Sequence, residues 1–341
     1  MYPLCKTSLP ASHRHVLDNK TILVIGDEQI SWTWIRTTLK NYGIKLVLVQ
    51  SKPNTFSSED VYSYIKYDFT EHRQDEVHAE RIIDKLSDAD LSIDGCCTFT
   101  DICGPIAAFV CEKLKLTGGV GVTGATNAWK KNSTHIYLQK QTDGVHHFPR
   151  TNKYTGRVAK FICKVTLSSA IWTVGFPAIC KPEHGADGDG VVLIRDEEGW
   201  HHLNKTLDTL LDDGNPMMLM EYFDGTEHDI EVIIYQGEIL AALVSDNGPT
   251  RPGSFMETSM SMPSGLPQPL VSQLGTAASH CCIDIGLRNV VFNVEMKLTS
   301  TGPGLLEING RMGGDYIRNW IYLCYRIDLL WFPVSPPNIT M

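Results

Sequence analysis

The chain has 341 residues, of which 43% are hydrophobic and 20% are charged, as in ordinary globular proteins. This length is enough for two or three packed domains. The formal net charge is -9 and no basic run stands out, which argues against nucleic acid as the main partner.

The ends of the chain and its cysteines bear on location. Residues 1–20 are polar and lack the apolar stretch of a signal peptide. No apolar run approaches the roughly 18 to 20 residues that a membrane span needs, so we expect no membrane partner. The 10 cysteines contain no CxxC motif and no spacing typical of a zinc site or a disulfide framework. We therefore expect a reduced, cytoplasmic protein with a flexible segment at 1–19.

The region 20–116 alternates apolar runs with helical patterns. Strands are expected at 21–26, 44–49 and 88–99, and helices at 30–42 and 105–114. This order predicts a small, doubly wound parallel α/β domain that supports the rest of the chain and contributes to a substrate cleft. The loop at 26–29 is not GxGxxG and carries two acids, which would repel a pyrophosphate, so a dinucleotide site is disfavoured.

The segment that follows contains glycines and a lysine pair. Residues 118–124 are rich in glycine but have no Gly-Lys-Ser/Thr after them, so they are not a P-loop, and we interpret them as a linker and strand end. A helix is expected at 126–141. It contains Lys130 and Lys131, either of which could be a solvated surface lysine.

A second lysine precedes a glycine loop. A buried strand is expected at 176–182 and carries Lys181 near its end, a position where a lysine usually snorkels. The three glycines of the next loop are Gly185, Gly188 and Gly190. Because glycine amides can close over phosphate oxygens, this pattern favours a phosphate clamp. Asp187 and Asp189 would face the phosphates unless they turn outward.

The next two strands are expected at 217–223 and 227–235. The end of the first, which consists of Glu221, Tyr222 and Phe223, could present its backbone to an adenine edge. Glu227, which follows the turn, could accept ribose hydroxyls. The alternative is a plain hairpin with acids that face solvent.

A polar turn at 245–253 follows a strand expected at 238–244. The turn carries Arg251, which could hold a carboxylate bidentately or could belong to a mere connection. A helix is expected at 271–286.

Two strands near the end carry oxygen ligands, and they are expected at 290–297 and 305–308. Glu295 lies on the first. Glu307 and Asn309 lie two residues apart and therefore point to the same face of the second. Carboxylate and amide oxygens are ligands that Mg²⁺ prefers, so this set could hold one or two ions against a nucleotide's phosphates, with Arg311 as an adjacent positive charge. The alternative is two amphipathic strands with exposed carboxylates.

In this order the pieces resemble an ATP-grasp ligase over residues 20–330. The resemblance implies an α/β fold in which two α+β lobes clamp ATP, preceded by the small parallel domain. The implied domains are 20–116, 117–330 with a lid lobe at about 150–225, and a divergent tail at 331–341. The nucleotide ligands that the resemblance implies are Lys131, Lys181, Gly185, Gly188, Gly190, Glu221, Tyr222, Phe223 and Glu227. The implied metal ligands are Glu295, Glu307 and Asn309, and the implied catalytic side chains are Arg311, Arg251 and Lys181.

Four runs are similar, more narrowly, to carnosine synthases, and they are 220–229, 244–251, 291–299 and 307–314. The run Ser-Asp-Asn-Gly-Pro-Thr-Arg within the second is the most specific. This resemblance implies ATP-dependent joining of L-histidine to β-alanine or 4-aminobutyrate. The carboxylate would attack the γ-phosphate with the help of Mg²⁺ or Mn²⁺, and the amine would displace phosphate from the resulting acyl phosphate. A homo-oligomer is compatible with the family.

The chain departs from that family in three respects. Carnosine synthases are longer at both ends, and here the resemblance stops near Leu330. Gly310 stands where the family usually has Pro, and the lid carries Asp187 and Asp189 where small or apolar residues are commoner. Two alternatives stay open: another ATP-grasp carboxylate–amine ligase, or a truncated nucleotide-binding protein without turnover.

Overall fold

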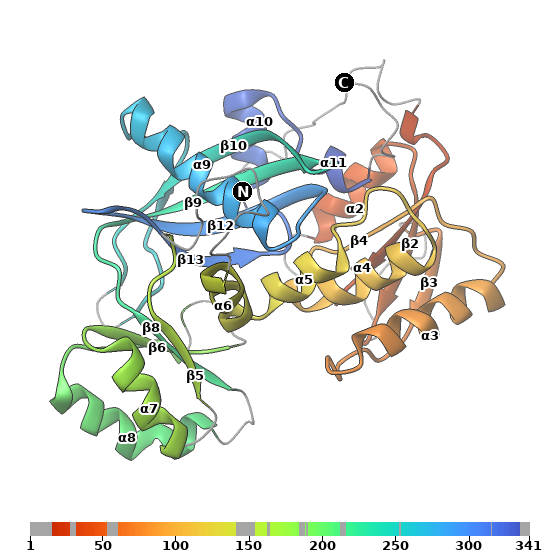
Figure 1. Cartoon of the computed structure of the whole chain (residues 1–341). Helices are drawn as coiled ribbons and strands as arrows, with labels where there is room; N and C mark the ends of the chain where they lie inside the picture. Colours follow the sequence, from red (N-terminus) through yellow and green to blue (C-terminus); the bar gives the residue numbers. More distant parts are fainter. Residues whose placement is uncertain are drawn as a thin grey trace.

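A computed structural model of the chain describes residues 16–27, 32–52, 61–140, 154–161, 164–183, 188, 190–211, 216–251, 254–314 and 316–334. In this part of the chain the strands form three sheets, which Figure 1 shows as separate bodies with helices packed against them. The α/β class predicted from the sequence is confirmed. The domain limits at 19, 116 and 330 stay a prediction.

The first sheet is parallel and has the order β3-β2-β1-β4. Its strands are β1 (Thr21–Ile25), β2 (Lys45–Gln50), β3 (Ser63–Lys66) and β4 (Gly95–Cys97). Its helices are α2 (Trp32–Asn41), α3 (Asp75–Asp88), α4 (Gly104–Lys113) and the short η1 (Asp101–Cys103). In β1, Ile22 and Val24 belong to one hydrophobic core while Leu23 and Ile25 belong to another. Both faces are therefore covered, which explains why the strand is apolar throughout.

The strand expected at 88–99 was wrong in its first half. Helix α3 continues to Asp88, the chain turns, and β4 begins only at Gly95. Asp90 has a φ of 52°, the left-handed conformation that ends helices. Strand β3, which has only four residues, and helix α3 had no counterpart in the prediction.

The single helix expected at 126–141 is two helices, α5 (Val122–Trp129) and α6 (Lys131–Lys140). They are separated at Lys130, whose backbone is extended with φ -102° and ψ 100°. The strand end expected at 118–124 is instead the start of α5. A Cβ on Gly124 would lie 2.5 Å from the carbonyl carbon of Gly286, so this helix meets the chain before β12 in a contact that only glycine permits.

The second sheet is antiparallel, with the order β5-β8-β6-β7, and it belongs to the predicted lid lobe. Its strands are β5 (Val158–Phe161), β6 (Ala178–Pro182), β7 (Val192–Ile194) and β8 (Met217–Glu221). Helices α7 (Lys164–Val174) and α8 (Glu197–Leu211) lie beside it, at the lower left of Figure 1. Alternate residues of β8 divide between two cores, because Met217 and Leu219 pack in the same core as α7 while Met218 and Met220 pack in another.

The third sheet is antiparallel and has the order β11-β10-β9-β12-β13. Its strands are β9 (Thr226–Tyr235), β10 (Glu238–Asn247), β11 (Met260–Ser261), β12 (Val290–Thr299) and β13 (Gly302–Asn309). The remaining helices are α9 (Gln268–Asp284), α10 (Ile317–Tyr325) and α11 (Trp331–Val334). Strands β8 and β9 belong to different sheets, so the alternative of a plain hairpin is excluded. The link between them connects the lid lobe to the sheet that carries the acidic residues.

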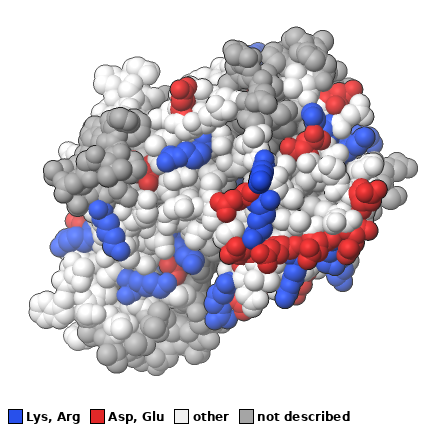
Figure 2. All heavy atoms as spheres, turned by 45° about the vertical axis from the view of Figure 1, so that its right-hand side comes forward, with Lys and Arg blue, Asp and Glu red and all other residues white. Residues whose placement is uncertain are grey.

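The charge distribution on the surface agrees with the expectation that no basic area gathers on the protein. On the face drawn in Figure 2, the described Lys and Arg side chains are scattered among Asp and Glu and form no continuous basic area. Among the described residues, no helix is both long and apolar enough to pass through a bilayer.

Candidate active site

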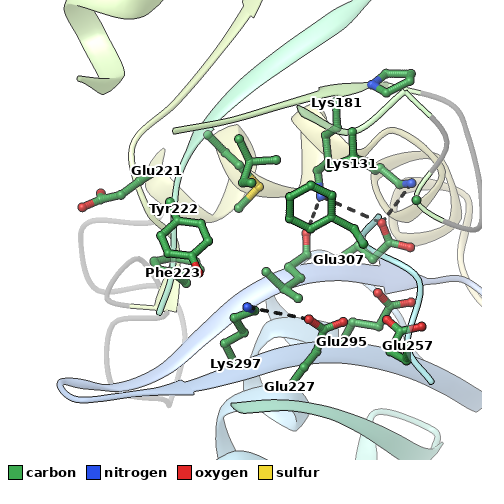
Figure 3. A pocket seen from close by; sticks show the side chains of 17 residues that line it. Lys131, Lys181, Glu221, Tyr222, Phe223, Glu227, Glu257, Glu295, Lys297 and Glu307 are labelled. Carbon is green, nitrogen blue, oxygen red and sulfur yellow. Dashed lines mark hydrogen bonds and ion pairs between the residues drawn. The ribbon is translucent and has the colours of Figure 1, made fainter. Parts of the chain in front are cut away.

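A cavity of about 230 Å³ lies between the lid sheet and the third sheet, and most of the predicted site residues line it (Figure 3). The predicted residues in its wall are Lys131, Lys181, Gly188, Glu221, Tyr222, Phe223, Glu227, Glu295 and Glu307. Gly188, Tyr222 and Phe223 lie between strands, and the others come from α6, β6, β8, β9, β12 and β13. The structure therefore brings together side chains that are up to 176 residues apart (131 to 307).

Two lysine side chains of this cavity converge on the carboxylate of Glu307. Lys131 Nζ lies 2.9 Å from its Oε2 and Lys181 Nζ lies 4.0 Å from the same atom. Burial by itself would raise the pKa of Glu307, but the two ammonium groups outweigh it and lower that pKa. Burial lowers the pKa of Lys181, and the Glu307 carboxylate opposes that shift. The ammonium groups of Lys131 and Lys181 therefore favour the ionised form of the Glu307 carboxylate.

Strands β12 and β13 pair as the sequence predicted, and their register places Glu295 opposite Glu307. Burial, followed by the charge of Glu307, raises the pKa of Glu295 well above its ordinary value. Asn309 uses its amide nitrogen on Asn293 Oδ1 (2.8 Å) and Glu295 Oε1 (3.2 Å), so its Oδ1 is the atom left for a cation. Two opposed carboxylates and an amide oxygen fit a hard divalent ion, whose charge would relieve their repulsion.

Among the described residues, no three His, Cys, Asp or Glu side chains lie close enough to hold a metal ion by themselves. The predicted ligand set does not require such a group, because it consists of two carboxylates and an amide, with phosphate oxygens supplying the remaining positions.

A shift in register explains why two consecutive residues of β13 face the cavity. Glu295 pairs with Glu307, but Met296 pairs with Leu305, so Leu306 is an extra residue in a β-bulge. Leu305 and Ile308 pack in the core with α9, whereas Leu306 and Glu307 line the cavity. A regular strand would alternate and could not achieve this.

The apolar half of the cavity is suited to a flat ring. It is lined by Ile179, Val191, Met220, Phe223 and Leu306. Figure 3 shows the Glu221 side chain turned away from this wall. Its Oε2 lies 3.2 Å from Arg157 Nε. The predicted use of the hinge backbone rather than this carboxylate is compatible with that orientation.

Glu227 lies on the opposite wall with two neighbours that the sequence analysis did not single out. Lys297 Nζ lies 3.9 Å from Glu227 Oε2 and 5.5 Å from the centre of the Tyr222 ring. Burial, and then a hydrogen bond with Glu257, raises the pKa of Glu227 to about 8. Lys297 could have been found from its spacing of two from Glu295 on one strand. Glu257 follows an irregular loop and had no sequence signal.

The two predicted arginines lie outside the cavity wall. Arg311 donates from Nε to Asp101 Oδ2 at 2.9 Å and from Nη1 to the Met312 carbonyl at 2.9 Å. It therefore joins the first sheet's η1 to the end of β13, while its charge still acts on Glu307, whose pKa it helps to lower. Arg251 is exposed in the polar turn, and Gly190 is exposed too. Gly185, Asp187 and Asp189 lie outside the described residues.

Residues 174–319 match the family model of the ATP-grasp domain. The chain carries an ATP-grasp domain. Carnosine synthase 1 of Mus musculus is 38% identical over 339 residues, which cover 96% of this chain and 41% of that protein. Carnosine synthase 1 of Gallus gallus is also 38% identical, and the match covers 96% of this chain and 36% of that protein. The chain is thus a homologue of carnosine synthases and spans about two fifths of their length.

Solved structures agree on the fold of this ATP-grasp chain. An L-amino acid ligase from Bacillus licheniformis superposes with a TM-score of 0.73 at 18% identity, over 92% of this chain and 72% of that one. An N5-carboxyaminoimidazole synthetase from Staphylococcus aureus, complexed with ADP, superposes with a TM-score of 0.72 at 15% identity. The superposition covers 96% of this chain and 79% of that one. The ATP-grasp fold predicted from the sequence is confirmed.

Proposed function

We propose that this chain carries out ATP-dependent ligation of a carboxylate to an amine. The observation that carries the proposal is the convergence of Lys131 and Lys181 on Glu307, directly opposite Glu295, in a cavity between two lobes. Homology to carnosine synthases over 96% of the chain supports this chemistry.

The cavity has a place for each part of a nucleotide. The adenine would lie against the apolar wall, with the backbone of Phe223 reading its edge, and Glu227 would accept ribose hydroxyls. The phosphates would contact Lys131, Lys181 and the lid at Gly188. Glu295, Glu307 and Asn309 would hold Mg²⁺, or Mn²⁺ in its place, and that ion would supply charge neutralisation at the phosphate oxygens.

The reaction needs positioning and electrostatics more than a nucleophilic side chain. The substrate carboxylate attacks the γ-phosphorus of ATP and ADP leaves, which gives an acyl phosphate. The substrate amine then attacks the acyl carbon, and inorganic phosphate leaves as the amide forms. Lys131 and Lys181 stabilise negative charge on the transferred group, and closure of the lid protects the acyl phosphate from water.

The substrates we propose are L-histidine with β-alanine or 4-aminobutyrate, because carnosine synthase 1 of Mus musculus is 38% identical over 96% of this chain and the run at 245–251 resembles that family. Another carboxylate–amine pair is the alternative on the same scaffold, as the fold shared with an L-amino acid ligase indicates. A nucleotide-binding role without turnover is the second alternative. A cytoplasmic location and a homo-oligomer also remain proposals.

ADP release with Mg²⁺, ATP, L-histidine and β-alanine tests the proposal, with each amino acid omitted in turn. We expect release to require both, with 4-aminobutyrate able to replace β-alanine. Glu307→Gln, which keeps the shape but removes the charge, should lower turnover at least about 100-fold, whereas Glu238→Gln on the exposed start of β10 should not. Equal ADP release without amino acids would contradict the dipeptide assignment. Nucleotide binding without ADP from any amino-acid pair would favour the role without turnover.

A further inference from the structure

The carbonyl oxygen of Leu306 receives donors from two distant elements. His135 Nε2, on α6, lies 3.1 Å from it and Lys181 Nζ, on β6, lies 3.3 Å from it. Leu306 is the extra residue of the β-bulge in β13, and β13 is the edge strand of its sheet. A bulge takes a residue out of the strand ladder, so its carbonyl needs partners from elsewhere.

The tautomer of His135 follows from this contact. A carbonyl oxygen can only accept, so Nε2 carries the hydrogen and Nδ1 is the unprotonated nitrogen. The side chain is completely buried, and Nδ1 has no hydrogen-bond partner among the described residues. Burial, and then the charge of Lys181, lowers the pKa of His135 to about 4, which agrees with a neutral ring.

Packing alone does not account for a histidine at this position. Burying a nitrogen without a partner costs free energy that an aliphatic side chain of similar size would avoid. What the imidazole adds over an aliphatic group is the Nε2–H donated to Leu306. His135 also lies one helical turn after Lys131, on the same face of α6. The helix thus contacts Glu307 through one residue and the bulge beside it through the other.

We propose that His135 is a positioning residue that holds the bulge at Leu306 and thereby aims Glu307 at Lys131, Lys181 and the divalent cation. This inference rests on the proposed function, since it assigns Glu307 to the metal and phosphate site. His135 does not touch the nucleotide in this role. It acts through the backbone of β13.

Two amide substitutions separate the two ring nitrogens. In His135→Gln the side-chain nitrogen reaches the place of Nε2, so the contact with Leu306 is kept. In His135→Asn the nitrogen reaches only the place of Nδ1, so the contact is lost although the residue stays polar and neutral. Binding of a non-hydrolysable ATP analogue is measured by calorimetry at a series of Mg²⁺ concentrations, together with the melting temperature.

We expect His135→Asn to raise the Mg²⁺ concentration for half-maximal binding by about 10- to 100-fold, the range found when support of a metal ligand is removed. Nucleotide affinity without Mg²⁺ should change little, and His135→Gln should stay within about threefold of wild type. The matched control is His78→Leu. His78 is also buried, and its Nε2 lies 3.1 Å from a backbone carbonyl, that of Glu71, in the first sheet's domain. It should alter the melting temperature alone.

An unchanged Mg²⁺ dependence in His135→Asn, or equal defects in the Asn and Gln variants, would overturn the inference. If the wild-type chain binds Mg²⁺ and nucleotide but forms no amide, the ligase assignment fails and the inference is still decided by binding. If wild type binds no nucleotide, both proposals fail.

Discussion

Lys130 and Lys131 are adjacent in sequence, but only one of them contacts the candidate active site. The break between α5 and α6 falls at Lys130, and only Lys131 reaches Glu307, at 2.9 Å. Loss of a charged hydrogen-bonding partner costs about 1.5–3 kcal/mol. We therefore expect Lys131→Met to weaken binding of the non-hydrolysable ATP analogue roughly 10- to 100-fold by calorimetry. Lys130→Met should bind as wild type does, and equal losses would show that the lysine pair acts only through net charge.

Glu231 is a buried carboxylate that faces the end of β13 but does not line the cavity. It accepts hydrogen bonds from Asn293 Nδ2 at 2.9 Å and from the Gly313 amide at 3.0 Å. Burial raises its pKa to about 7, although both donors favour the charged form. The shift makes the stability of the fold depend on pH.

The sign follows from linkage. The pKa of Glu231 is raised from 4.5, the value we take for the unfolded chain, to about 7 in the folded protein. The protonated side chain therefore stabilises the fold fully below pH 4.5, and this stabilisation is lost as the pH rises to 7. The loss is on the order of 3 kcal/mol. Glu231→Gln cannot ionise, so its stability relative to wild type should increase over this window in urea unfolding. A difference that stays constant with pH, as we expect for the exposed Glu238→Gln, would contradict the assignment.

At the scale of elements, the link between β8 and β9 depends on one glycine. Gly225 has a φ of 92°, and a Cβ there would lie 2.1 Å from the Leu298 carbonyl oxygen. The turn can therefore pass against β12 only without a side chain. This close approach places Glu227 at the cavity wall, just after the chain leaves the lid lobe.

Gly225→Ala should lose about 1–2 kcal/mol for the left-handed backbone and about 1–3 kcal/mol more for the overlap. Gly237 is the matched control, since it has a similar φ of 83° but its nearest neighbour to an added Cβ is Arg288 Cδ at 3.6 Å. Gly237→Ala should show only the backbone part. Urea unfolding measures the stability loss of each variant. Equal losses would mean that the chain at Leu298 can shift to accommodate the added Cβ.

At the scale of the molecule, one ion pair joins the parallel sheet's domain to the ATP-grasp sheet. Arg311 Nη2 lies 2.7 Å from Asp101 Oδ2, with only 21% and 28% of the two side chains exposed. This contact fixes Arg311 just outside the residues that line the cavity. It also makes the first domain a structural support for the strand end that carries Asn309.

A double-mutant cycle of Asp101→Ala and Arg311→Leu should give a coupling energy of about 1–3 kcal/mol in unfolding experiments. The exposed pair Lys20–Asp94, at 2.8 Å and with 38% of each side chain exposed, should give less than about 1 kcal/mol. If the Asp101–Arg311 coupling is no larger than that, the pair does not join the domains energetically.

The residue order by itself determined the ATP-grasp fold, the pairing of the last two long strands and most of the charged residues that line the cavity, with Glu257 and Lys297 as the exceptions. These are local patterns: apolar strands, a lysine before glycines, and Glu and Asn at a spacing of two on one strand. The order in which such pieces follow one another is written in the chain, so no contact needs to be known.

Tertiary structure decided the features that depend on contacts between segments far apart in the sequence. Whether Lys130 or Lys131 reaches the site depends on where the helical segment breaks, and that break falls at Lys130. The bulge at Leu306 becomes visible only through its register with β12. Arg311 binds Asp101, 210 residues away in the sequence. In each case the outcome follows from contacts between segments that are distant in sequence, and such contacts leave no periodic pattern in either segment alone.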